Sequence, residues 1–273
     1  MDTIISTIIS FYLLSTASYV AYLFFQKENL NRIGFYILLA GLAAHSATII
    51  TLLVKTGHMP VRNLYETLSI AAWAVAAVFV FVRFQFNLKI LGIIAAPLAL
   101  IIMVIATFFP QQPAETKAIF SNFWLMFHIL TIFIADAAFA LACGAGILYL
   151  VQEQNIKTKT RGFFYKRLPS LELLDSTGYA CIIVGFALLT TGLIAGFVYA
   201  KSVWGRFWSW DPKEVWSAVT WLVYAALLHE RFVAGWRGKR MAVMSIIGFA
   251  VLLFTFIGVN FLLKGHHGEF TRL

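Results

Sequence analysis

Eight long runs of apolar residues, separated by short polar breaks, constrain this chain more than any other feature of its sequence. They span roughly 4–24, 33–54, 64–83, 88–108, 123–151, 177–200, 212–232 and 241–263. A helix needs about 20 residues to cross the apolar layer of a bilayer. The runs are continuous rather than alternating, which excludes a membrane β-barrel. The sequence therefore predicts an all-α integral membrane protein, a polytopic bundle of about eight transmembrane helices.

The composition leaves little room for anything besides these helices. Hydrophobic residues make up 61% of the chain and charged residues only 12%. Soluble domains carry about 25% charged residues, so an ordinary soluble fold is excluded. Disorder is excluded too, because apolar residues are in excess. We predict one membrane domain over residues 1–273, with a cytoplasmic loop at about 152–176 and an outer-face loop at about 204–216.

The distribution of basic residues predicts the orientation. Thirteen of the 21 Lys and Arg residues fall in alternate loops, and eight fall in the others. Positive charge marks the cytoplasmic side, so we expect both termini on the outer face. The net charge of +9 is then a sign of orientation rather than of nucleic-acid binding. The two cysteines form no CxxC motif, which argues against a thiol-redox role. The first apolar run lacks a basic segment before it, so we expect a retained span rather than a cleaved signal peptide.

A tryptophan-rich segment, WGRFWSWDPKEVWSAVTW at 204–221, is the most unusual local feature. It holds five of the eight tryptophans of the chain: Trp204, Trp208, Trp210, Trp216 and Trp221. Asp211, Pro212 and Glu214 have the spacing of a helix start closed by a capping box, so we expect a helix from Pro212. An interfacial aromatic belt explains one or two tryptophans. Five in one segment are explained better by a flat aromatic shelf that binds a large planar ligand.

Such a ligand is expected to be acidic as well as planar. The start of the helix at Pro212 and the side chain of Arg206 are placed to hold acidic groups beside the shelf. A porphyrin with its propionates matches this description.

The same segment resembles the WWD signature of heme-handling proteins in cytochrome c maturation. The likeness extends through GHMPVRNLYETLSIAAW (57–73), LPSLELLDSTGYACIIVGFALLTTGLIAG (168–196) and GWRGKRMAVMSIIGFAVLLFTFIGVN (235–260). On these motifs the chain is similar to the CcsA/ResC-type proteins of the system II machinery.

The resemblance implies a subunit of a cytochrome c synthase, or heme lyase. It would carry heme b to the outer face and present it for thioether attachment to the CxxCH motif of apocytochrome c. The implied partners are a CcsB/ResB-type membrane subunit, on which activity would depend, apocytochrome c and thiol-reducing proteins. The implied location is a bacterial inner or plasma membrane, or a thylakoid membrane, with the WWD loop on the outer side.

The resemblance also assigns roles to residues. His128 and His267 would be the axial ligands of iron at the outer face, with His266 as the alternative to His267. His229 lies roughly 25 Å deeper than Pro212 along its helix and would ligate iron at a second, inner site completed by the companion subunit. The ring would be cradled by tryptophans, with Asp211 either a structural cap or a direct heme contact. These tryptophans are Trp204, Trp208, Trp210 and Trp216.

Three residues keep open roles, and two other functions compete. His45, in the middle of a span, is expected to be structural or part of a substrate path, and His58 to be a loop histidine. Asp136 has no assigned role. The competing functions are a polytopic transporter of another amphipathic ligand and a b-type electron-transfer subunit. No catalytic base is apparent in the sequence.

Overall fold

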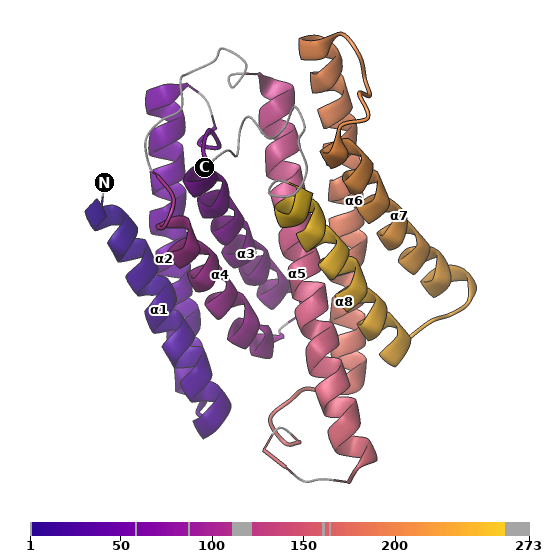
Figure 1. Cartoon of the computed structure of the whole chain (residues 1–273). Helices are drawn as coiled ribbons and strands as arrows, with labels where there is room; N and C mark the ends of the chain where they lie inside the picture. The colour runs from indigo at the N-terminus through magenta and orange to yellow at the C-terminus, as the bar shows by residue number, and fades with distance from the viewer. Residues whose placement is uncertain are drawn as a thin grey trace.

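Eight α-helices form the protein in the computed structural model, which describes residues 2–57, 59–86, 88–110, 122–159, 162–163 and 165–259. All regular structure in these ranges is helical, as predicted. A 3-10 turn, η1 (Lys89–Leu91), precedes α4, and a π-helical turn, η3 (Phe254–Gly258), follows α8. The helices are α1 (Asp2–Phe25), α2 (Glu28–Thr56), α3 (Leu64–Phe86), α4 (Gly92–Ala106), α5 (Phe123–Lys157), α6 (Leu171–Trp204), α7 (Pro212–Val233) and α8 (Lys239–Leu253) (Figure 1).

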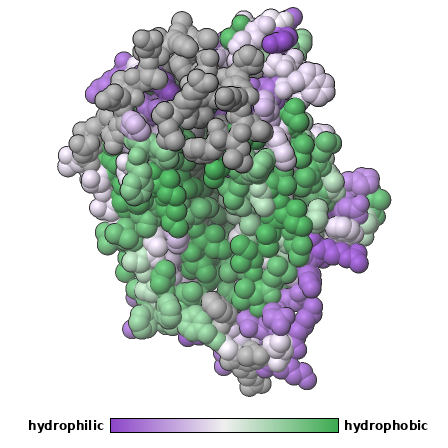
Figure 2. Space-filling view, in the orientation of Figure 1, coloured by the Kyte–Doolittle hydropathy of each residue, from purple (hydrophilic) through white to green (hydrophobic). Residues whose placement is uncertain are grey.

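Seven of these segments are long and apolar enough to cross a membrane, which confirms the predicted membrane bundle. The segment predicted at 212–232 does form a helix, α7, but it is not among the seven. Lys213 and Glu214 stand at its start and Glu230 and Arg231 at its end, so its apolar stretch is short. Figure 2 shows an apolar band across the molecule, with hydrophilic residues gathered above and below it.

Consecutive long helices run in alternating directions, so their ends gather at two ends of the bundle (Figure 1). The start of α5, the end of α6 and the start of α7 lie together at one end, which we call the tryptophan-loop end. The loops that follow α5 and α7 lie at the opposite end. Which end faces the cytoplasm stays a prediction from the basic residues.

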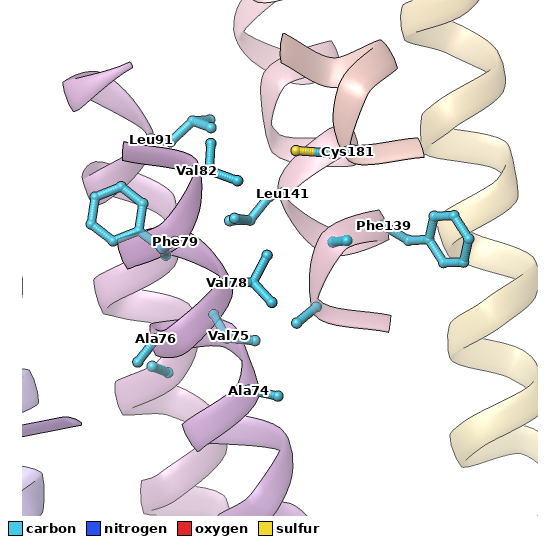
Figure 3. Packing of buried hydrophobic residues seen from close by; sticks show 14 of the residues in the cluster. Ala74, Val75, Ala76, Val78, Phe79, Val82, Leu91, Phe139, Leu141 and Cys181 are labelled. Atoms are coloured by element: carbon cyan, nitrogen blue, oxygen red, sulfur yellow. The ribbon is translucent and has the colours of Figure 1, made fainter. Parts of the chain in front are cut away.

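The core is centred on α5, whose two sides pack against different helices. Leu141 faces Val78 and Val82 of α3, whereas Phe139 points the other way (Figure 3). The Phe139 ring stacks on the ring of Tyr224 in α7, with centroids 3.6 Å apart and planes 12° apart. The most extensive contact between described helices is that of α5 with α6. This pair therefore forms the frame on which the tryptophan-loop end is built.

An ion pair fixes the opposite end. The carboxylate of Asp175 in α6 accepts hydrogen bonds from both terminal nitrogens of Arg231 in α7, at 3.2 and 2.9 Å. The same carboxylate accepts the backbone N–H of Gly238 at 2.8 Å, and Arg231 also donates to the carbonyl of Trp236 at 2.9 Å. These bonds tie α6, α7 and the turn before α8 together, and both charged side chains are nearly buried.

Candidate functional site

A cavity of about 280 Å³ opens at the tryptophan-loop end, between α5, α6, α7 and η3. This volume is near the lower limit, about 300 Å³, of pockets that bury most of a small ligand. Its walls are mainly leucine, isoleucine, phenylalanine and alanine side chains. Its charged or imidazole side chains are His128, Asp136, Lys213 and Glu214, and Tyr199, Trp204 and Trp208 add aromatic rings to the wall.

His128 stands in the cavity wall with its imidazole fixed by a backbone group. Helix α5 begins where the side chain of Asn122 accepts the backbone N–H of Trp124 at 2.8 Å, which places His128 in the second turn. The Nδ1 atom of His128 lies 2.7 Å from the carbonyl oxygen of Gly192 in α6. A carbonyl only accepts, so Nδ1 carries the proton and the lone pair of the neutral ring is on Nε2. This arrangement is typical of histidines that bind metals.

Gly196 of α6 makes room for this imidazole, and Gly192 makes room for the neighbouring side chains of α5. A Cβ atom on Gly196 would lie 2.8 Å from Nδ1 of His128, and one on Gly192 would lie 2.8 Å from the hydroxyl of Thr131. Glycines four residues apart form a GxxxG pattern, which lets two helices approach closely in a membrane. The position of the imidazole is therefore a consequence of the close contact between α5 and α6.

The tryptophans of the predicted shelf separate into two groups. Trp204 and Trp208 line the cavity. Trp210 is 78% exposed and does not line it, and its ring stands at 90° to that of Trp208. Trp216 packs against Phe254, with centroids 4.5 Å apart. The aromatic surface is thus the wall of a pocket rather than a flat shelf of four rings.

The start of α7 has the predicted capping box. The Asp211 carboxylate accepts the backbone N–H of Lys213 at 2.9 Å. Glu214 accepts the backbone N–H groups of Ser209 and Asp211, at 2.7 and 3.3 Å, and the Ser209 hydroxyl at 2.9 Å. Asp211 is 4% exposed and does not line the cavity, so its observed role is that of a cap. Arg206 is exposed and lies outside the cavity wall as well.

The other candidate ligands are not at this cavity. His229 is exposed near the far end of α7, so it and His128 do not share a site. His58, His266 and His267 lie outside the described residues, and the predicted pairing of His128 with His267 remains a prediction. Within the ranges that the structure describes, no three His, Cys, Asp or Glu side chains gather as a metal site.

His45 connects three helices. Its Nδ1 lies 3.0 Å from the hydroxyl of Tyr12 in α1, and its Nε2 lies 2.8 Å from the hydroxyl of Ser69 in α3. The ring is 1% exposed. Both nitrogens therefore have hydrogen-bond partners, which favours the structural one of the two roles that the sequence left open.

Sequence reasoning did not assign Tyr199, Lys213 or the residues of η3 to the site. Thr255 and Phe256 of η3 line the cavity, and π-helical turns are frequent at functional sites. Lys213 lies inside the tryptophan-rich segment, and this position in the sequence could have indicated that it belongs to the site. Tyr199 precedes that segment by one helical turn. Asp136, two turns below His128 on α5, also lines the cavity.

Comparison with known proteins identifies the family. The profile of a family described as "Cytochrome C assembly protein" matches residues 61–267. The CcsA cytochrome c biogenesis protein of Guillardia theta is 36% identical over 278 residues, covering 93% of this chain and 91% of the relative. That of Synechococcus sp. (strain JA-3-3Ab) is 33% identical, covering 89% and 86%.

The fold has a counterpart among solved structures. A cytochrome c heme lyase, CcmF, superposes with a TM-score of 0.66 at 15% sequence identity. The match covers 98% of this chain but 48% of CcmF, so the chain spans about half the length of that protein. The likeness at this identity is one of fold. With the family match and the curated relatives, it leads to one conclusion: the chain belongs to the cytochrome c assembly protein family, as a CcsA-type cytochrome c biogenesis protein.

Proposed function

We propose that this chain is the heme-handling subunit of a cytochrome c synthase. It carries heme b, its substrate, to the outer face of the membrane and presents it for attachment to the CxxCH motif of apocytochrome c. The membrane is a bacterial inner or plasma membrane or a thylakoid membrane. The proposal is supported by the family of the chain and by relatives named as cytochrome c biogenesis proteins.

The observation that carries the proposal is the state of His128. Its Nδ1–H donates to the carbonyl of Gly192 at 2.7 Å, so the nitrogen with the lone pair is Nε2. The ring stands in an apolar cavity beside Trp204 and Trp208. An imidazole of fixed orientation in apolar, aromatic surroundings suits the axial ligation of heme iron.

The second axial ligand at this site is His267, with His266 as the alternative. His229 serves a separate, inner heme site. Its exposed position on α7 favours a ligand pair completed by another chain, and a CcsB/ResB-type subunit is the proposed partner. Heme reaches the outer site after the inner one, and the tryptophan-rich loop therefore faces the periplasm, the exterior or the thylakoid lumen.

Attachment needs the vinyl groups of heme to meet two reduced thiols. Each thiol adds across one vinyl group: sulfur bonds to the inner carbon, and the thiol hydrogen goes to the terminal carbon. No oxidant is consumed, and the protein contributes the orientation of the ring and control of the redox state of its iron. The thiols must arrive reduced, which is the part assigned to separate thiol-reducing proteins. The histidine of CxxCH then replaces one axial ligand.

The experiment is an absorption spectrum of the purified full chain, alone and co-expressed with its partner subunit. Wild type is compared with His128→Ala, His267→Ala and His229→Ala, and with His45→Ala as a control histidine outside the cavity. We expect the reduced bis-histidine spectrum of the outer site to disappear in the first two variants and to persist in the other two. Heme bound by wild type is then tested for attachment to a CxxCH peptide.

Other results would overturn the proposal. Absence of heme from wild type, even with the partner, would favour a transporter of another amphipathic ligand. Bound heme that never attaches to the peptide would favour a b-type electron-transfer subunit. Heme retained without His128 and lost without His229 would keep heme handling but reject the outer ligand pair.

A further inference from the structure

Lys213 brings a positive charge into the wall of an apolar cavity. It lies in the first turn of α7, is partly buried and lines the cavity beside Trp204 and Trp208. Among the residues that the structure describes, its Nζ atom has no direct hydrogen bond or salt bridge, and the Asp211 carboxylate acts on its charge from nearby. An ammonium group in apolar surroundings is costly unless an anion pairs with it. Its ammonium group is therefore available to pair directly with a negative group of a ligand in the cavity.

Acidic side chains stand near Lys213. Asp211 acts electrostatically on its charge, and Glu214 and Asp136 line the same cavity. The carboxylates of Asp211 and Glu214 accept hydrogen bonds from the capping box and from Ser209. The capping box also satisfies N–H groups at the start of α7, which lowers the capacity of the helix terminus for another anion. Arg206 is exposed and outside the cavity wall. Lys213 is thus the cation of this segment that a ligand in the cavity meets.

Tyr199 gives a second, independent sign of a polar ligand group. It is 5% exposed and lines the same cavity from α6. Its buried hydroxyl has no hydrogen-bond partner among the described residues. Buried hydroxyl groups are rarely left unpaired in native proteins, because an unmade hydrogen bond destabilises the fold. A carboxylate would accept this O–H and pair with the ammonium group.

We propose that Lys213 and Tyr199 form a carboxylate-binding subsite for the propionates of the heme cargo. The inference rests on the function proposed above and names the groups that recognise the edge of the ring. Lys213 pairs with a propionate, and the Tyr199 hydroxyl donates a hydrogen bond to a carboxylate oxygen. Both residues come from the helix ends that flank the tryptophan loop, at the end of the molecule that holds His128 (Figure 1).

This subsite would control the rotation of the ring. An axial histidine fixes the tilt of the porphyrin plane, but it permits rotation about the bond between iron and nitrogen. The two propionates occupy one edge of protoporphyrin, and the vinyl groups lie away from that edge. Holding the propionates at Lys213 and Tyr199 therefore directs the vinyl groups away from them, where the two thiols must be received.

The test compares iron protoporphyrin IX with its dimethyl ester, which lacks both negative charges. Each is titrated into the full chain, purified in detergent and freed of heme, for wild type, Lys213→Met, Lys213→Arg, Tyr199→Phe and Arg206→Met. We expect Lys213→Met to weaken binding of the diacid about 10- to 100-fold and Tyr199→Phe about 3- to 10-fold. Binding of the diester should change little in either variant.

The control variants and the spectrum separate this subsite from a structural effect. Lys213→Arg should retain most of the affinity for the diacid, and Arg206→Met all of it. The spectrum of the bound diester should stay that of wild type, because iron ligation is untouched. Equal losses for diacid and diester, or a loss in Arg206→Met alone, would overturn the subsite. If wild type binds the diacid and diester equally, the subsite is wrong while heme handling stands; if it binds neither, the proposed function itself fails.

Discussion

Gly196 of α6 faces the imidazole of His128 so closely that a Cβ atom there would lie 2.8 Å from Nδ1 and 2.9 Å from Cε1. Both distances are shorter than real Cβ contacts. The ligand that we propose for iron is therefore held by the absence of a side chain on the neighbouring helix. Replacing that glycine should disturb iron ligation while leaving every histidine in place.

We expect Gly196→Ala to reduce heme bound at the outer site about tenfold, because overpacking costs about 1–3 kcal/mol and the ring must move. Absorption of the purified protein measures this. Gly178→Ala is the matched control, since a Cβ atom there meets only ordinary contacts, the nearest at 3.6 Å from Ala145. Equal heme content in the two variants would contradict the close fit around His128.

Trp208 and Trp210 should differ in their effect on heme. Trp208 lines the cavity, whereas Trp210 is 78% exposed and outside it. We expect Trp208→Ala to weaken heme binding about tenfold through lost aromatic contact and buried area. Trp210→Ala should leave the affinity within about twofold. Heme titration measures both affinities. A larger loss of affinity in Trp210→Ala than in Trp208→Ala would contradict the assignment of Trp208 to the cavity wall.

His45 should affect stability rather than heme. His45→Leu removes the partner of the Tyr12 and Ser69 hydroxyl groups, and unpaired buried groups cost about 1–3 kcal/mol each. We expect a lower melting temperature in detergent with unchanged heme per folded molecule. His229→Ala, at an exposed position, serves as the control and should melt like wild type. Loss of outer-site heme at an unchanged melting temperature would assign His45 to the site instead.

Asp175 should be the more important of two acidic residues near the end opposite the tryptophan loop. Asp175→Asn weakens the pair with Arg231, whose charge then stays nearly buried without compensation. Breaking such a pair costs about 3 kcal/mol or more. Glu153→Gln removes a more exposed pair with Lys157 and should cost under about 1 kcal/mol. Thermal melting of both variants tests whether Asp175→Asn loses more stability than Glu153→Gln. Equal decreases in melting temperature would contradict this prediction.

The sequence predicted the helices well because long apolar runs have few other solutions in a membrane. The start of α7 at Pro212 is confirmed, because Asp211 and Glu214 carry a local capping signal that does not depend on tertiary contacts. The start of α6 was less apparent. The apolar run begins at about 177, whereas the helix begins at Leu171, because Ser170 caps the helix and its first two turns contain Glu172, Asp175 and Ser176.

The arrangement of side chains around the cavity was harder to predict. In a helix that is apolar on all sides, no hydrophobic pattern indicates which face meets its neighbour. Tyr199 therefore gave no sign that it would line the cavity. Trp210 adopts a backbone φ of 59°, which turns the chain just before α7. The number of tryptophans in the segment does not reveal that turn. The sequence therefore predicted that four tryptophan rings surround one ligand.

The hydrogen-bond acceptor of His128 is a main-chain oxygen, and no substitution at position 192 can remove it. The imidazole tautomer is thus determined by the register between α5 and α6, and not by a side chain that a mutation could replace. A slip of α6 along its axis by one residue, about 1.5 Å, would carry this carbonyl out of place. A displacement of α6 relative to α5 would then change the affinity of His128 for iron, although no residue of the pocket is substituted.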